Sequence, residues 1–293
     1  METLSQLGED AVLRRLLPHL TTNGSLLVGA GDDCAVAARN AEWDTLLKTD
    51  AVVEGVHFTR GTEPERIGRK ALARAVSDVA AMGGIPEHAL VTLLVHPQRA
   101  VELVEGIYRG LERLAAEFGI SLAGGETTAL PHDGLAISVA LTGRVEHGKA
   151  VLRSTGRPGD ILYVSGRLGG SFESGRHLDF TPRVELARAL AERGLRPSAM
   201  MDLSDGLGTD LPRLAAASRC GFAVDESALP LHDGCTPRQG ICDGEDYELL
   251  MSFPPRLAEQ LSTATLPTPV TRIGELTAQG AQNLPSGWLH FTA

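Results

Sequence analysis

Six short segments of this chain place carboxylates beside glycines and hydroxyl side chains. Taken singly, each segment is more readily explained as a solvated carboxylate or a helix cap. Taken together they favour a metal–phosphate site, because hard oxygen ligands suit Mg²⁺, which shares its coordination shell with substrate phosphates. The segments are Gly31-Asp32-Asp33, Lys48-Thr49-Asp50, Ser77-Asp78, Gly124-Gly125-Glu126-Thr127-Thr128, Asp202-Leu203-Ser204-Asp205-Gly206 and Gly244-Glu245-Asp246.

Asp78 differs from the other acidic residues because it falls inside a predicted helix, at the edge of its apolar face. A carboxylate buried there would require a cation or a metal as its partner, since an unpaired buried charge is strongly unfavourable. An exposed carboxylate on the flank of the helix would require neither. The sequence leaves both possibilities open.

The common nucleotide-binding and nucleophile motifs are missing from the sequence. Residues 143–150 match a Walker A loop except at Ala150, which lacks the hydroxyl that would bind Mg²⁺. There is no G-x-G-x-x-G motif and no nucleophile elbow. Any ATP would therefore be bound by another fold, and the lack of an obvious nucleophile fits direct phosphoryl transfer, in which the protein mainly positions groups and neutralises charge.

The elements that must position these segments alternate between helices and strands, which favours an α/β (α+β) protein with mixed sheets. The clearest helix spans residues 65–82, with Pro64 at its start and Gly83-Gly84 at its end. The other predicted helices are 5–17, 101–118, 183–193, 207–219 and 257–261, and the predicted strands are 26–28, 45–50, 89–95, 120–123, 135–145, 161–165 and 270–273.

Length and charge narrow the class of protein. A chain of 293 residues is long enough for two domains, and the Gly- and Pro-containing stretch at 153–160 predicts a division into 1–148 and 149–293. A net charge of −10 argues against nucleic acid or an anionic membrane as the main partner. The sequence shows no apolar run of the roughly 18–20 residues that span a bilayer and no signal-peptide pattern. Its four cysteines form no C-x-x-C pair, so we expect reduced thiols and a cytoplasmic protein.

Seven motifs in a fixed order make the chain similar to the thiamine-monophosphate kinases, a family of the aminoimidazole ribonucleotide synthetase-like superfamily. The resemblance covers nearly the whole chain, and T-D-x-x-V-x-G-x-H-F and D-L-S-D-G are its most specific elements. The motifs are GDDCA (31–35), TDAVVEGVHF (49–58), ALARAVSDVAAMG (71–83), GGETT (124–128), RSTGRPGD (153–160), DLSDGL (202–207) and GEDYEL (244–249).

The resemblance implies a fold, a site and partners. It implies an N-terminal half whose mixed sheet forms a barrel with a second subunit, a C-terminal half with a mixed sheet flanked by helices, and ATP in the cleft between the halves. It also implies a homodimer, and Asp50, Asp78, Asp205 and Arg153 as catalytic residues. The implied Mg²⁺ ligands are Asp33, Thr49, Asp50, Asp78, Glu126, Asp202 and Asp205, the implied ATP contacts are Tyr108, Gly125, Arg153 and Ser204, and the implied thiamine-phosphate contacts are His57, Glu245 and Trp288.

Three positions depart from the family pattern. Glu126 stands where the family usually has Asp, which moves the carboxylate outward by about 1.5 Å. Lys48 stands where the family usually has Ser or Thr, so a contact made through the hydroxyl would be lost and one made through the main chain would survive. Cys242-Asp243-Gly244 replaces the usual double glycine before Glu245, which affects the path of that loop.

The implied reaction is the phosphorylation of thiamine monophosphate by ATP, with several Mg²⁺ ions assisting in-line transfer. The acceptor is an anionic phosphate oxygen, so the main obstacle is repulsion between two anions rather than the lack of a base. Trp288 would stack on the cationic thiazolium ring; a core or surface tryptophan is the alternative. Two other functions stay open, another ATP-dependent enzyme of the superfamily or a non-catalytic nucleotide- or metal-binding module.

Overall fold

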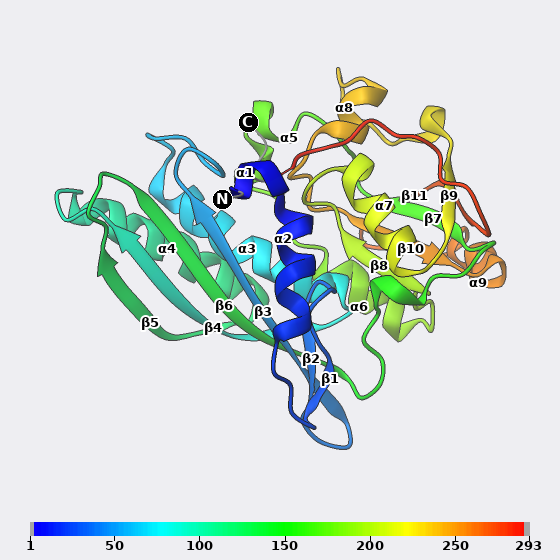
Figure 1. The fold of residues 1–293 in the computed structure, drawn as a ribbon, viewed down its shortest axis with the longest axis horizontal. Helices are drawn as coiled ribbons and strands as arrows, with labels where there is room; N and C mark the ends of the chain where they lie inside the picture. Colours follow the sequence, from blue (N-terminus) through cyan, green and yellow to red (C-terminus); the bar gives the residue numbers. More distant parts are fainter. Residues whose placement is uncertain (1–2, 290–293) are drawn as a thin grey trace.

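The computed structural model describes residues 3–289 and contains two β-sheets with helices packed on them (Figure 1). The first sheet has the strand order β1-β2-β3-β6-β4-β5, in which only the β4–β5 pair is parallel. Its strands are β1 (Leu26–Val28), β2 (Ala35–Ala38), β3 (Trp43–Val53), β4 (Ile85–Val95), β5 (Ser121–Ala129) and β6 (Leu135–Glu146).

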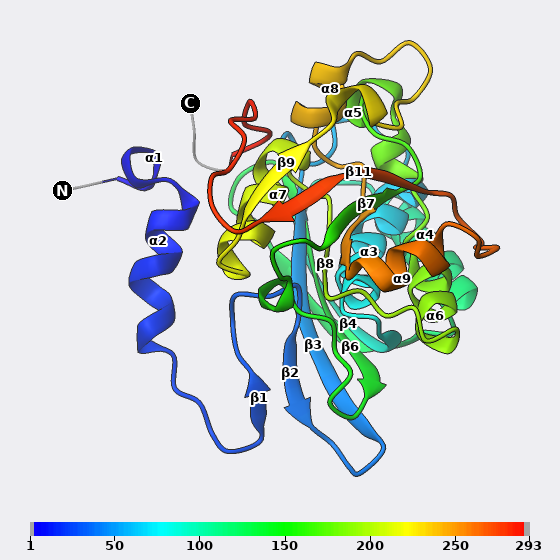
Figure 2. The same cartoon turned by 90° about the vertical axis from the view of Figure 1, so that its right-hand side faces the viewer.

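Helices α3 (Pro64–Ala81) and α4 (Val101–Phe118) lie side by side on one face of this sheet (Figures 1 and 2). Glycines permit this close approach: a Cβ on Gly68 would lie 1.9 Å from the Ile107 carbonyl oxygen, a distance that any larger residue would have to relieve by moving the helices apart. The opposite face of the sheet is open, and it exposes Leu47, Val53 and Leu90.

The second sheet has the order β8-β10-β7-β11-β9, and all its strand pairs are antiparallel. The prediction of two α/β halves is confirmed, but only the first sheet is mixed. Strands β7, β8 and β9 run in one direction, as helical crossovers between them require, and β10 and β11 are inserted between them in the other direction. The strands are β7 (Ile161–Ser165), β8 (Ala199–Asp202), β9 (Gly221–Val224), β10 (Leu249–Phe253) and β11 (Val270–Thr277).

Most predicted elements are present, with three kinds of difference. The predicted helix 5–17 is interrupted at Gly8, whose φ of 72° is not helical. The predicted strand 120–123 continues further along the chain, because residues 124–128 also belong to strand β5. Strands β2, β8, β9 and β10 were not predicted; every residue of β8 and β10 is buried, so no alternation marks those two. The remaining helices are α1 (Leu4–Leu7), α2 (Glu9–Leu16), α5 (Ser171–Ser174), α6 (Val184–Glu192), α7 (Leu207–Ala217), α8 (Pro237–Cys242) and α9 (Pro255–Leu261).

Helix α3 connects the two sheets. It packs on β3 and β6 of the first sheet and also contacts β8 and α6 from the other half of the chain. The two sheets use strands on either side of the predicted boundary at 148/149, although the division into two domains stays a prediction. All four cysteines are free thiols. Within residues 3–289, no helix is long and apolar enough to cross a membrane.

Candidate active site

Helix α3 directs three charged residues, Lys70, Arg74 and Asp78, toward the boundary between the two sheets. They are spaced by four residues and therefore share one face of the helix. Lys70 is fully buried and Asp78 is 6% exposed, so each needs an ionic or hydrogen-bonding partner from another element. Arg74, between them, forms an ion pair with Asp50 on β3, in which Arg74 Nε lies 3.1 Å from Asp50 Oδ2.

Three buried carboxylates meet beside this face. Asp33 precedes β2, Asp78 lies on α3 and Asp202 ends β8, and each offers an oxygen within 4.8 Å of the others. The Ser77 hydroxyl donates to Asp202 Oδ2 at 2.6 Å. The question left open by the sequence is thus answered for Asp78, which is buried and paired rather than exposed on the flank of the helix.

Burial and mutual repulsion act on these carboxylates. Burial raises the pKa of Asp78 well above its ordinary value, and Asp202 adds to the effect. Burial, with the Asp33 charge, raises the pKa of Asp202 to about 6. Carboxylates crowded in this way are stabilised by a cation between them, and an all-oxygen donor set suits Mg²⁺. The residues present therefore fit a magnesium site.

Basic side chains balance the acidic residues within the chain itself. Arg153 Nη2 lies 2.5 Å from Asp33 Oδ1, and Lys48 Nζ lies 2.8 Å from Asp78 Oδ1. Although burial acts to lower it, the pKa of Lys48 is raised above its ordinary value by the nearby Asp78 and Asp50 carboxylates. On the other side of the cluster, Arg213 of α7 lies 2.5 Å from Asp205.

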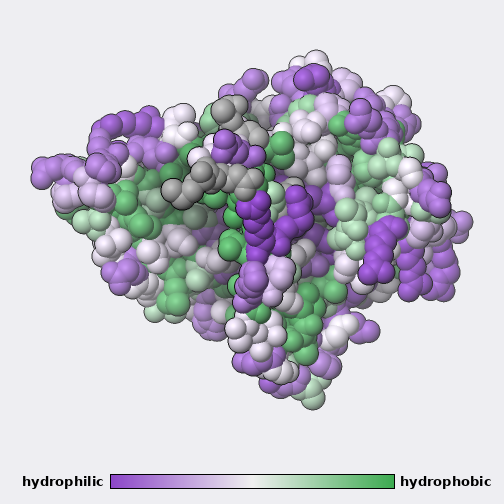
Figure 3. Space-filling model, viewed as in Figure 1, coloured by the Kyte–Doolittle hydropathy of each residue, from purple (hydrophilic) through white to green (hydrophobic). Residues whose placement is uncertain are grey.

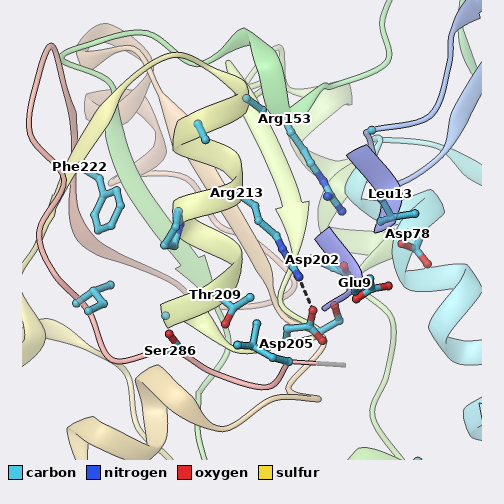
Figure 4. Close-up of a pocket in the computed structure, with 18 of the residues that line it drawn as sticks. Glu9, Leu13, Asp78, Arg153, Asp202, Asp205, Thr209, Arg213, Phe222 and Ser286 are labelled. Atoms are coloured by element: carbon cyan, nitrogen blue, oxygen red, sulfur yellow. Dashed lines mark hydrogen bonds and ion pairs between the residues drawn. The ribbon is translucent and has the colours of Figure 1, made fainter. Parts of the chain in front are cut away.

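Two cavities adjoin at this cluster. The larger, of about 1020 Å³, is lined by Arg153, Asp202 and Arg213 and by the N-terminal helix α2; Figure 4 shows Arg153 and Arg213 pointing toward Asp202 and Asp205. The smaller, of about 520 Å³, is also lined by residues that do not border the larger one, among them Phe172. Both cavities are lined by Arg74, Ser204, Asp205 and Tyr247, so the two spaces meet there.

The smaller cavity is lined by His57, Glu245 and Trp288, all three predicted from the resemblance as contacts of thiamine phosphate. Lys70 connects His57 and Glu245: its Nζ lies 2.7 Å from both Glu245 carboxylate oxygens and donates to the His57 carbonyl oxygen. Burial, reinforced by Arg74, lowers the pKa of His57 to about 4. His57 is therefore neutral near pH 7, and its Nδ1 accepts the Val53 N–H.

The loop before β10 is held in an unusual backbone conformation. Glu245 and Tyr247 have φ values of 65° and 51°, in the region that side chains other than glycine rarely adopt. The Glu245 N–H donates to the Ser204 carbonyl and the Tyr247 N–H to the Leu203 carbonyl, which hold both residues against the D-L-S-D-G segment. Asp243, at the position of the departure from the family pattern, accepts the Gly170 N–H. Strain of this kind is concentrated at functional sites.

Comparison with known proteins identifies the family of the chain. The family model for the AIR synthase related protein N-terminal domain matches residues 31–145, and the C-terminal domain model matches residues 157–285. A thiamine-monophosphate kinase from Rhodopirellula baltica is 34% identical, with 90% of this chain and 91% of that protein covered. One from Bacillus subtilis is 32% identical, with 92% and 91% covered.

The chain belongs to the thiamine-monophosphate kinase family. A solved structure described as AaThiL complexed with AMPPCP and TMP has the same fold, with a TM-score of 0.84, 29% identity and 99% of both chains covered. The resemblance seen in the sequence is therefore confirmed at the level of family and fold.

Most of the residues that the family resemblance singles out lie together in one chain. Fourteen different positions were named, and nine of them, apart from Trp288, line the two cavities or form the carboxylate cluster between them. These nine are Asp33, Asp50, His57, Asp78, Arg153, Asp202, Ser204, Asp205 and Glu245, and Trp288 joins them at the rim of the smaller cavity with 53% of its surface exposed.

Four predicted residues are not brought to the cluster within one chain. Thr49 is exposed and alternates with Lys48 and Asp50, so its side chain lies on the open face of the sheet. Tyr108 on α4 packs against the hydrophobic core between the first sheet and its helices. Gly125 and Glu126 lie on the edge strand β5, with β4 and β6 between them and β3, a separation of three strands or about 14 Å. Their roles stay predictions.

Several residues of the site were not predicted, namely Lys70, Arg74 and Arg213. The signal for the first two was present in the sequence. A charged residue recurs every fourth position through the Ala-rich helix at 70, 74 and 78, on the side where the helix is otherwise apolar. For Arg213 the only local signal is its place three residues after Asp210, with which it also pairs.

Proposed function

We propose that this chain transfers the γ-phosphoryl group of ATP directly to the phosphate of thiamine monophosphate, giving thiamine diphosphate and ADP. The observation that carries the proposal is the meeting of two cavities at Ser204 and Asp205. The larger cavity is lined by arginines, which can pair with nucleotide phosphates, and by carboxylates, which can hold Mg²⁺. The smaller cavity is lined by an aromatic side chain beside carboxylates. The relatives' shared name and the bound AMPPCP and TMP of the solved structure support this assignment.

Charge neutralisation is the main task of the site, because the acceptor phosphate is already anionic and needs no base. Arg153 and Arg74 line the larger cavity and would pair with phosphate oxygens. Mg²⁺, when bound, supplies further positive charge to the phosphates. Asp33, Asp78 and Asp202 would hold it, with Asp50 and Asp205 nearby, and Thr49 and Glu126 stay predicted ligands.

The smaller cavity suits the rings of thiamine monophosphate. Trp288 offers a face for stacking and for a cation–π contact with the thiazolium ring. Interactions with His177 and Lys70 outweigh the effect of burial and lower the pKa of Glu245, so Glu245 carries a negative charge near the cationic ring. Lys70 fixes that carboxylate against the His57 backbone, which positions both residues.

One assay distinguishes the proposed kinase from the two other functions that the sequence left open. ADP formation is measured with ATP and Mg²⁺, with and without thiamine monophosphate. We expect turnover only when thiamine monophosphate is present. Turnover that ignores thiamine monophosphate would indicate another ATP-dependent enzyme of the superfamily. No turnover under either condition would indicate a non-catalytic nucleotide- or metal-binding module.

A homodimer is the second part of the proposal. The open face of the first sheet exposes Leu47, Val53 and Leu90, and Figure 3 shows apolar surface over this part of the molecule. Strand β5 leaves one edge of that sheet unpaired. A second copy would cover both features, which otherwise favour aggregation. Light scattering should give about twice the 31.0 kDa chain mass, and a monomer at micromolar concentration would contradict the dimer.

A further inference from the structure

Lys48 places a positive charge inside the carboxylate cluster. It shares a face of β3 with Asp50 and lies opposite α3. Its Nζ is 2.8 Å from Asp78 Oδ1, and its side chain is only 22% exposed. Lys48 and Asp78 line the same cavity as Arg153 and Asp202. The ammonium group is therefore a fixed part of the site and not a surface charge that happens to lie nearby.

The three clustered carboxylates have different partners. Asp33 is paired with Arg153 and Asp202 accepts a hydrogen bond from Ser77, whereas the ionic partner of Asp78 is Lys48. A magnesium ion binds carboxylate oxygen at about 2.1 Å. An ion bound to the same Asp78 oxygen would thus lie within about 5 Å of the ammonium, a separation at which like charges repel strongly when water is largely excluded.

We propose that Lys48 acts as a tethered cation that takes the place of one divalent ion at Asp78. The cluster of this chain would then hold fewer or more weakly bound Mg²⁺ ions than its carboxylates alone would allow. The lysine supplies its charge without a binding equilibrium, so part of the positive charge at the site is present at any Mg²⁺ concentration. The catalytic meaning of this charge rests on the proposed kinase function, but the effect on metal binding does not.

Replacing Lys48 tests the proposal through metal binding alone. Free Mn²⁺ is measured by electron paramagnetic resonance during titration of the wild-type chain and of Lys48→Met, which keeps the length of the side chain and removes its charge. We expect Lys48→Met to bind Mn²⁺ at least tenfold more tightly or to bind one more ion per chain. Lys149→Met is the matched control, because Lys149 is exposed, follows the end of β6 and lines neither of the two cavities, and it should behave as wild type.

Binding of Mn²⁺ to Lys48→Met that is unchanged or weaker would overturn the proposal. Because removal of the lysine leaves Asp78 without its ionic partner, thermal unfolding gives a second readout. MgCl₂ should raise the Tm of Lys48→Met more than that of the wild type, and an equal rise would contradict the tethered cation. The double variant Lys48→Met with Asp78→Asn removes both charges, so it should fold and lose the gain in Mn²⁺ binding; a gain that persists would also contradict it.

Failure of this inference can be told apart from failure of the proposed function. A wild-type chain that makes thiamine diphosphate, together with a Lys48→Met variant whose metal binding is unchanged, would reject only the role of Lys48. A gain in metal binding by Lys48→Met, together with a wild-type chain that transfers no phosphoryl group, would reject only the kinase function.

Discussion

Replacement of Asp50 by Asn should lower kcat about 10²–10³-fold while the protein stays folded. Asp50 lines the larger cavity and pairs with Arg74, which also borders the smaller one. The amide of Asn has the same shape but no charge, so it neither binds a divalent ion as a carboxylate does nor holds Arg74 by an ionic contact. Steady-state rates at saturating ATP, thiamine monophosphate and Mg²⁺ give the measurement.

An exposed acidic residue supplies the matched control for Asp50→Asn. The Asp233 side chain is 99% exposed and pairs only at the surface with Arg167, so Asp233→Asn should keep the wild-type rate and Tm. A purified, folded Asp50→Asn protein with near wild-type turnover at saturating Mg²⁺ would show that this carboxylate lies outside the reacting site.

Truncation of Trp288 to Ala should raise the KM for thiamine monophosphate about five- to a hundredfold and leave the KM for ATP little changed. Stacking and cation–π contacts of an aromatic ring contribute roughly 1–3 kcal/mol, and about 1.4 kcal/mol corresponds to a tenfold change in affinity. Trp288 borders the smaller cavity, and its backbone N–H donates to the Asp205 carbonyl at 2.8 Å. That hydrogen bond survives the substitution and keeps the segment in place.

Tryptophan fluorescence gives an independent readout, because the chain has only two tryptophans. Thiamine monophosphate should quench the wild-type signal and should fail to do so in Trp288→Ala. Trp43 begins β3 and lies beneath the Arg144 guanidinium, 5.0 Å from it, so Trp43→Phe should keep the quenching. Equal weakening of ATP and thiamine monophosphate in Trp288→Ala would make Trp288 a structural residue, and no change in either constant would place it outside the pocket.

Local signals explain how much of the fold could be predicted. Helix α4 spans the predicted residues, and α3 differs from its prediction by only one residue at each end. Both helices carry a local end signal: Pro64 begins α3, and Gly119, in a left-handed conformation, ends α4. Strands such as β10, in contrast, are buried on both faces and carry no alternation. The predicted strand 120–123 stops before Gly124 and Gly125, yet the positive φ values of these glycines are accommodated within strand β5.

The candidate site divides in the same way. The acidic motifs were visible in the sequence because each one is short and contiguous, and the structure brings Asp33, Asp78 and Asp202 together from three separate segments. The cations that balance them could not be assigned from the sequence, because pairs such as Lys48–Asp78 depend on the packing of α3 against β3. Lys70–Glu245 likewise joins residues that are 175 positions apart, a contact that no local pattern encodes.

The most direct test of the account follows the phosphoryl group itself. The wild-type chain is incubated with ATP labelled at the γ-phosphate, with Mg²⁺ and with or without thiamine monophosphate, and both the small molecules and the protein are analysed. We expect the label to appear in thiamine diphosphate in a one-to-one ratio with ADP, and the protein to stay unlabelled when thiamine monophosphate is omitted. Label trapped on the protein would contradict direct transfer, and a lack of labelled thiamine diphosphate would contradict the proposed function.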